Sequence, residues 1–205
     1  MVKLIPLMGH GTVGKDYVYK ILCHSPSFEG MSSYIDTSDS AKAMLTKIRV
    51  QPSQAANENF QLSTLEKTDN YRRALVDIIK AFDELDIRLY ETMERINKIL
   101  SNRSYGEQPL FFIFINVRDV EFVAKLADIY KPLGIETFPL IITGENSYKN
   151  TELDSKEYED SIIPKLKYYD IEFARYENQK SDDPKKANAE ITKFAEKFKK
   201  TLLSR

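Results

Sequence analysis

The 205-residue sequence has little cysteine, little net charge and no long hydrophobic run. Its single cysteine, Cys23, excludes an intramolecular disulfide and favours a reducing, cytoplasmic compartment. Lys and Arg number 30 against 31 Asp and Glu, so no basic excess drives binding to nucleic acid or to an anionic membrane. The longest apolar run, Leu110–Ile115, has the length of a strand, and the apolar residues before Gly9 are too few for a signal peptide.

The residues that are present have the balance of a soluble globular domain. Hydrophobic residues make up 42% of the chain and charged residues 30%, and a chain of this length can bury a sizeable core. We therefore predict one domain over residues 1–205. Collagen-like, disulfide-framework, membrane and wholly disordered classes are excluded.

Hydrophobic periodicity predicts strands that alternate with helices. The expected strands cover residues 2–8, 33–36, 109–117, 137–143 and 169–174. The expected helices cover residues 16–23, 38–48, 68–100, 119–130 and a terminal segment from Pro184, with 68–100 either one helix or two helices broken near Asp83. Residues 51–63 are expected to be a loop, and 144–167 a polar surface segment that is partly helical. This alternation predicts an α/β fold with a mostly parallel central sheet and helices on both faces.

Ligands of such sheets bind at the carboxyl ends of the strands. Four parts of the sequence follow predicted strands and are therefore candidate site segments. They are residues 9–15, Asp36, residues 116–119 and the segment after Thr143.

The loop after the first predicted strand reads Gly9-His10-Gly11-Thr12-Val13-Gly14-Lys15-Asp16. The spacing G-x-x-x-x-G-K is that of a phosphate-binding P-loop, with an aspartate in place of the usual Ser or Thr. Its glycines let successive backbone N–H groups converge on phosphate oxygens, and the following helix directs its positive end at them. The lysine ammonium would bind the β- and γ-phosphates. The alternative is a glycine-rich strand-to-helix turn with an exposed lysine.

This loop resembles the P-loop of phage deoxynucleoside monophosphate kinases. It also resembles the P-loop of animal-type phosphomevalonate kinases. Three more segments resemble P-loop kinases: Asn116-Val117-Arg118 in place of Asp-x-Arg, the arginine-bearing 70–75, and 169–171 followed by Asn178. The resemblance implies a three-layer P-loop kinase-like fold with a helical acceptor-side region over about 38–102 and a lid-like segment over about 144–167. It also implies ATP and Mg²⁺ as cofactors, and a nucleoside monophosphate or similar small phosphorylated acceptor.

The sequence departs from the family pattern at two places. Asn116 stands where an aspartate would orient magnesium or the attacking hydroxyl, and an amide cannot act as a base. Asp16, Asp36 and Asp119 are the candidates for the missing carboxylate, and Asp16 is the tentative magnesium ligand. The lid-like segment contains no arginine; its nearby cations are lysines, which clamp a transferring phosphoryl group less well.

The candidate catalytic residues are Lys15, Arg118, Arg72 and Arg73, which would hold the donor phosphates and steady the acceptor. Arg72 and Arg73 could equally form a solvated helix face.

The candidate acceptor-binding residues are Asp36, Arg72 and Asn116, although Asp36 could instead cap the helix that follows it. The whole loop 9–16 is the candidate cofactor site, and His10 within it either touches phosphate or acts as a spacer.

Three functions stay open from the sequence. The first is a phosphotransferase that moves the ATP γ-phosphoryl group to a nucleoside monophosphate. The second is a non-catalytic nucleotide-binding protein that keeps the fold, and the third is a structural protein whose loop holds an adventitious anion. We expect a cytoplasmic protein without nucleic-acid or membrane partners, and a homodimer is one oligomeric state left open.

Overall fold

The computed structural model describes residues 1–10, 13–47, 69–103, 110–117, 119–144, 155–179 and 183–205, with only the backbone described at 45–47, 69–73 and 155–157. The chain forms two compact units. The first contains Met1–Asp36 and Ile96–Arg205, and the second contains Thr37–Arg95.

The first unit is built on a six-stranded sheet. Its strands are β1 (Val2–Met8), β2 (Ser32–Asp36), β3 (Leu110–Ile115), β4 (Glu136–Thr137), β5 (Leu140–Thr143) and β6 (Ala174–Glu177). The strand order is β2-β3-β1-β5-β6, with β4 also beside β1, and the pairings among these strands are parallel. Parallel neighbours need crossover connections, which the helices supply.

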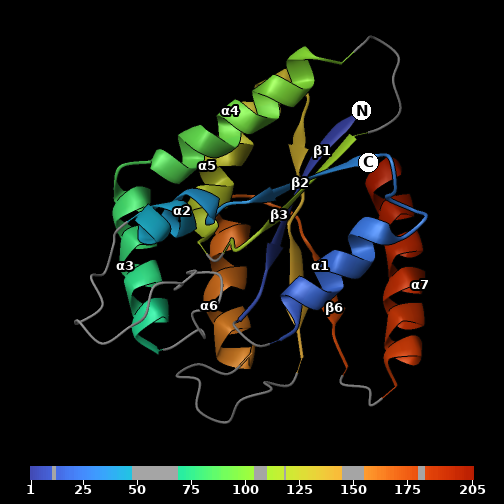
Figure 1. Cartoon of the computed structure of the whole chain (residues 1–205). Helices are drawn as coiled ribbons and strands as arrows, with labels where there is room; N and C mark the ends of the chain where they lie inside the picture. Colours follow the sequence, from blue (N-terminus) through green and yellow to red (C-terminus); the bar gives the residue numbers. More distant parts are fainter. Residues whose placement is uncertain (11–12, 48–68, 104–109, 118, 145–154, 180–182) are drawn as a thin grey trace. The chain divides into compact units, whose positions relative to one another are not determined.

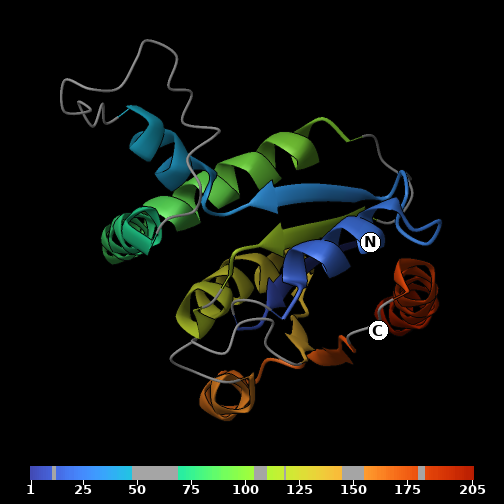
Figure 2. The ribbon, with the colours of Figure 1, turned by 60° about the horizontal axis from the view of Figure 1, so that its bottom comes forward.

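Helices cover both faces of this sheet, which confirms the predicted three-layer α/β fold. They are α1 (Lys15–His24), α5 (Val120–Tyr130), α6 (Ser155–Tyr168) and α7 (Pro184–Leu203), with a 3-10 turn η2 (Lys131–Leu133) after α5. In Figures 1 and 2, α1 and α7 lie on one face, and α5 and α6 lie on the other.

The core beneath α1 and α7 is rich in aromatic rings. Phe28 and Phe198 are both buried there, and the Phe28 ring lies 5.2 Å from the Phe111 ring of β3. Asp183 caps α7, because its side chain accepts a hydrogen bond from the Lys185 backbone N–H. The predicted terminal helix is confirmed.

The second unit contains α2 (Asp39–Lys47), α3 (Asp69–Glu84) and the start of α4 (Ile87–Ser101). Of the two alternatives for residues 68–100, the structure has two helices. Asp86 lies between them with φ +54°, a left-handed conformation that a continuous helix does not contain. Arg88 is buried and forms an ion pair with Asp83 at 2.6 Å.

Two strand predictions are wrong in their boundaries. The segment predicted as one strand over 137–143 is divided into β4 and β5, because Pro139 has no N–H to donate to a ladder. The last strand is Ala174–Glu177 and not 169–174: the N–H groups of Tyr169 and Ile171 donate back to carbonyls of α6. These residues therefore form the C-terminal end of α6, and their alternating apolar pattern does not mark a strand.

The segment 144–167 is helical from Ser155 onward, and residues 145–154 lie outside the described residues, as does the predicted loop 51–63.

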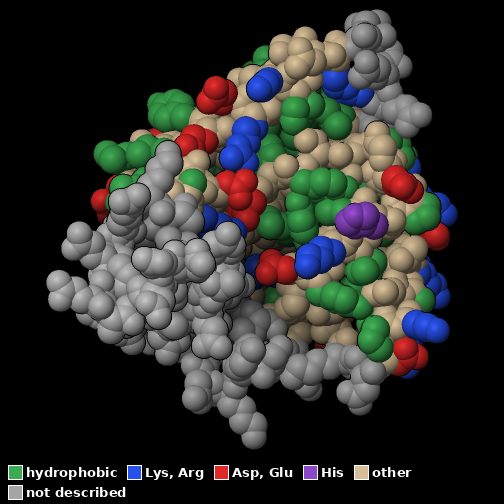
Figure 3. All heavy atoms as spheres, viewed as in Figure 1, with side chains coloured by type: hydrophobic (Ala, Val, Ile, Leu, Met, Phe, Trp, Pro, Cys, Tyr) green, Lys and Arg blue, Asp and Glu red, His purple; other side chains and the backbone are tan. Residues whose placement is uncertain are grey.

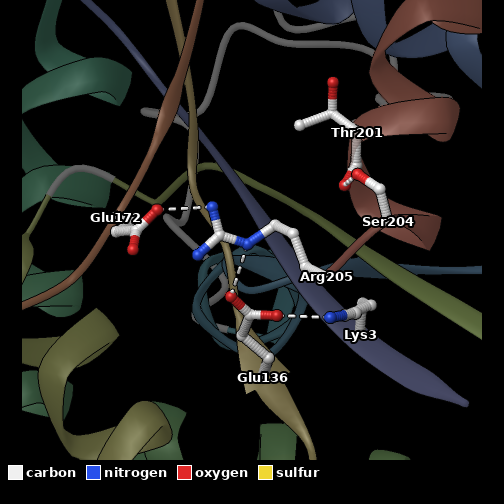
Figure 4. Close-up of polar contacts among 6 residues, drawn as sticks. All are labelled: Lys3, Glu136, Glu172, Thr201, Ser204 and Arg205. Carbon is white, nitrogen blue, oxygen red and sulfur yellow. Dashed lines mark hydrogen bonds and ion pairs between the residues drawn. The ribbon is translucent and has the colours of Figure 1, made fainter.

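The end of α7 is tied to the sheet by the polar cluster drawn in Figure 4. Arg205 donates from Nε to Glu136 at 3.0 Å and from Nη1 to Glu172, while the buried Lys3 of β1 also donates to Glu136. The guanidinium carbon lies 4.5 Å from the centre of the Phe138 ring. The Arg205 hydrogen bond holds the pKa of Glu172 below its usual value.

On the face drawn in Figure 3, Lys and Arg side chains of the described residues lie among Asp and Glu side chains, with hydrophobic side chains between them. Within the described ranges, no helix is both long and apolar enough to cross a membrane.

Candidate functional site

The strands of the first unit end at one edge, where the candidate site segments meet. Asp36 ends β2 and is in register with Ile115, the last residue of β3. Gly9 follows β1, and Gly144 follows β5. In the strand order, the connection that leaves β1 leads toward β2, and the connection that leaves β3 leads in the opposite direction, toward β5. The ends of β1 and β3 therefore form the switch point at which parallel sheets bind ligands.

The strand order also separates this sheet from two common doubly wound arrangements, in which β2 is the direct neighbour of β1. Here β3 lies between β1 and β2. The ends of both β1 and β3 consequently border the loop that leaves β1.

Two glycines of the predicted P-loop have positive φ values and a close neighbour where a Cβ would lie. Gly9 has φ +151°, and a Cβ there would lie 2.4 Å from the Ile142 backbone oxygen. Gly14 has φ +78°, and a Cβ would lie 2.5 Å from Asn178 Nδ2. Gly14 is also the N-cap of α1, where no side chain makes a capping hydrogen bond. The first turn of α1 thus presents its positive end without a side-chain acceptor from the cap.

Lys15 is buried at the start of α1, with 9% of its surface exposed. Its ammonium donates to the backbone carbonyls of Gly9 and His10, each at 2.6 Å. The lysine therefore folds back over the loop rather than extending into solvent. The alternative of a turn with an exposed lysine does not fit this burial.

Asn178 fixes the loop from the other side. It follows β6, its backbone N–H donates to Thr143 at 2.8 Å, and its Nδ2 donates to the Val13 carbonyl at 2.9 Å. The sequence marks it only as a polar residue after the last strand. Its partner is 165 residues away, so no local signal reveals the contact.

The Asp36 carboxylate lies beside Asn116, whose Nδ2 donates to Asp36 Oδ1 at 2.8 Å. Asn116 has φ +62°, a left-handed conformation that asparagine tolerates better than most residues. The alternative that Asp36 caps the next helix stays a prediction. That helix begins at Asp39, and the Ser38 carbonyl accepts its first-turn bond from Lys42.

The other two candidate carboxylates are placed differently. Asp119 caps α5, since its Oδ1 accepts from the Glu121 N–H at 2.9 Å. Asp16 is exposed in the first turn of α1. Asp36, in contrast, accepts a hydrogen bond from the Asn116 side chain. Within the described ranges, no group of three His, Cys, Asp or Glu residues is arranged to hold a metal ion.

His10 packs at the edge of this region. Its ring lies 6.3 Å from the Tyr158 ring of α6, and its Nδ1 is buried with no hydrogen-bond partner among the described residues. A buried imidazole nitrogen in this state is unusual, because buried polar atoms are normally paired.

Several predicted residues cannot be placed at the site. Gly11, Thr12 and Arg118 lie outside the described residues. Arg72 and Arg73 lie on α3 in the second unit, where only the backbone is described. Their proposed roles stay predictions.

Comparisons with known proteins do not place the chain in a family. No protein-family model matches it, and no curated protein matches it. The evidence for a function is the geometry of the sheet edge: a glycine loop, a buried lysine and the Asp36–Asn116 pair.

Proposed function

We propose that the chain is a P-loop phosphotransferase that moves the γ-phosphoryl group of ATP to a nucleoside monophosphate. The observation that carries the proposal is the turn from β1 into α1. It combines two glycines with positive φ, a helix start without a side-chain cap, and a lysine folded over the loop.

These features suit an anion with several oxygens. Backbone N–H groups of the loop and of the first helical turn donate to phosphate, and the helix dipole favours negative charge there. The ammonium of Lys15 is already beside the loop, bound to two neutral carbonyls. Exchange of a carbonyl for a phosphate oxygen replaces a neutral acceptor with a charged one, and such bonds are roughly twice as strong.

The remaining roles extend this proposal to the acceptor. From the resemblance to P-loop kinases alone, Arg118 and an arginine of the pair Arg72 and Arg73 would steady the acceptor and the transferring group. Asp16 is the protein ligand for Mg²⁺, which ordinarily needs only one or two carboxylates beside the phosphates and water. When bound, Mg²⁺ neutralises charge on the donor phosphates.

A specific observation favours a second candidate, a nucleotide-binding protein without turnover. Asn116 occupies the place of the family's aspartate, and its amide cannot take up a proton. Its Nδ2 is engaged with Asp36. Binding of a nucleotide to the loop does not depend on this position, whereas transfer does.

Phosphoryl transfer from ATP–Mg²⁺ to a panel of nucleoside and deoxynucleoside monophosphates distinguishes the two candidates. Products are read by mass spectrometry for the wild type and Lys15→Ala. A product that disappears in the variant supports the kinase and identifies its acceptor. Absence of product, together with Lys15-dependent ATP binding, supports the binding protein. Absence of ATP binding contradicts both.

A further inference from the structure

The strand β6 ends the sheet on one side. It follows β5 in the strand order, and within the described part of the chain no strand lies beyond it. In Figure 2, β6 is the outermost strand at the lower margin of the sheet. An edge strand presents a row of N–H and C=O groups with which the strand of another chain can pair.

The pairing with β5 identifies which backbone groups of β6 point outward. The N–H groups of Ala174 and Asn178 donate on the β5 side, to carbonyls at 2.9 and 2.8 Å. Every second residue of a parallel strand bonds the same neighbour, so Tyr176 also faces β5. Arg175 and Glu177 therefore direct their N–H and C=O groups away from β5. Among the described residues, these outward groups have no hydrogen-bond partner.

The two outward residues carry opposite charges on one face of the sheet. Arg175 and Glu177 are both exposed, and side chains two residues apart in a strand share a face. Arg175 forms an ion pair with Glu159 of α6 at 3.6 Å, yet its side chain remains 55% exposed. The Tyr176 ring lies on the other face, 4.5 Å from the Phe194 ring of α7. The open edge thus offers one cation and one anion side by side.

Antiparallel pairing with the β6 strand of a second copy makes these features complementary. When the Tyr176 residues of the two copies lie opposite each other, Arg175 of each copy lies opposite Glu177 of the other. Both residues of such a pair have outward backbone groups, so each pair exchanges both of its N–H···O bonds. Opposite charges then face each other across the strands, which is favourable.

Neighbouring registers lose this complementarity. A shift by one residue places outward groups opposite groups that already bond β5. A shift by two residues keeps the backbone bonds but places Arg175 opposite Arg175, or Glu177 opposite Glu177, and like charges directly opposite are destabilising. The charges of β6 therefore select one register.

The other edge strand, β2, has no such match. The Phe111 N–H donates to the Met31 carbonyl, so the even-numbered residues of β2 point their backbone groups outward. Asp36 is the one charged residue among them. Pairing of β2 with a second copy of itself brings no opposite charges together.

We propose that two copies of the chain pair antiparallel through β6, about a two-fold axis at Tyr176, and share one continuous sheet. A surface that pairs with itself about a two-fold axis closes, so the assembly stops at two chains. Because the edge is short, we expect a reversible dimer with a Kd below about 100 μM. This dimer is independent of the proposed phosphotransferase function, since its axis uses no residue of the loop 9–16.

Sedimentation velocity between about 1 and about 500 μM chain tests the dimer. The wild type should pass from the mass of one chain to that of two. Arg175→Glu and Glu177→Arg each place like charges opposite each other and should raise Kd at least about tenfold. An equimolar mixture of these two variants restores opposite charges and should form a mixed dimer. The double variant, Arg175→Glu with Glu177→Arg, should recover dimerisation by itself.

Two controls separate this contact from general effects of charge. Lys20→Glu changes the charge by the same amount at an exposed position of α1 and should dimerise like the wild type. Glu159→Gln removes the ion-pair partner of Arg175 within the chain without changing β6, and it should not raise Kd.

Hydrogen exchange of the wild type identifies the surface without any substitution. The amides of Arg175 and Glu177 should exchange more slowly at high chain concentration, whereas the Tyr176 amide, bonded to β5 in either state, should change less. Far-ultraviolet circular dichroism detects a variant that does not fold, and the exchange measurement then tests the same surface.

Three results overturn the proposal. One is a wild type that stays monomeric at about 500 μM. Another is a dimer whose Kd is the same in Arg175→Glu and Glu177→Arg, which would place the contact elsewhere, for instance at β2. The third is a pair of folded single variants that form no mixed dimer. Slowed exchange at Arg175 and Glu177 together with the mixed dimer supports it.

Discussion

Gly9→Ala tests whether the loop needs its close approach to the sheet. The new Cβ would lie 2.4 Å from the Ile142 backbone oxygen, and a backbone atom cannot rotate away. The strands β1 and β5 would have to separate. Overpacking of this kind costs about 1–3 kcal/mol, and a strained backbone conformation adds about 1–3 kcal/mol. We expect a loss of about 3 kcal/mol or more in the free energy of unfolding.

Gly30→Ala is the matched control. Gly30 also has a positive φ, +70°, but no atom lies within 4 Å of the added Cβ. Only the backbone preference is lost there, about 1 kcal/mol. The difference of about 2 kcal/mol corresponds to about 1 M in urea midpoint at a typical slope of about 2 kcal/mol/M. Because the chain has no tryptophan, unfolding is followed by far-ultraviolet circular dichroism. Equal midpoints for the two variants would refute the packing argument.

Two further predictions concern contacts distant in sequence. Asn178→Ala removes the side-chain bond to the loop and should weaken ATP binding about fivefold, the equivalent of one hydrogen bond of about 1 kcal/mol, in calorimetry. The control Gln179→Ala changes the next residue, which is exposed, and should leave ATP affinity unchanged. Equal effects of the two substitutions would argue against stabilisation of the loop by Asn178. Arg205→Gln should destabilise the fold at pH 7 by about 1 kcal/mol through loss of the contact with the Phe138 ring. Because Arg205 lowers the pKa of Glu172, that ion pair stabilises above the unfolded pKa of about 4.5, and its contribution disappears as pH falls through the lower folded value. The part of the wild-type advantage that comes from the ion pair should therefore be lost at acidic pH, while the part from the Phe138 contact remains. An advantage in thermal unfolding that does not change with pH would exclude a contribution from this ion pair.

The fold could be predicted because its signals are local. Apolar runs of strand length separated by amphipathic helices indicate a parallel sheet, and the loop 9–16 carries its chemistry in eight consecutive residues. The boundary errors have local causes too. Pro139 divides a continuous apolar run, and the alternation at 169–171 belongs to the exit of a helix.

The contacts that complete the candidate site could not be predicted. Asn116 and Asp36 are 80 residues apart, and Asn178 and Val13 are 165 apart. Only the strand order brings each pair together, and the order is not encoded in any one segment. Hydropathy also gave no reason to expect that Lys15 is buried, because a lysine at a helix start normally lies in solvent.

The most direct test of the central claim is a calorimetric titration of ATP–Mg²⁺ into the wild type, Lys15→Ala and Lys20→Ala. Lys20 is an exposed lysine on the same helix and serves as the control. The loop geometry predicts that Lys15→Ala keeps the fold and weakens ATP affinity at least about tenfold, or roughly 1.4 kcal/mol, while Lys20→Ala binds like the wild type. Equal ATP affinity in all three proteins would contradict the assignment of this loop as a nucleotide-phosphate site.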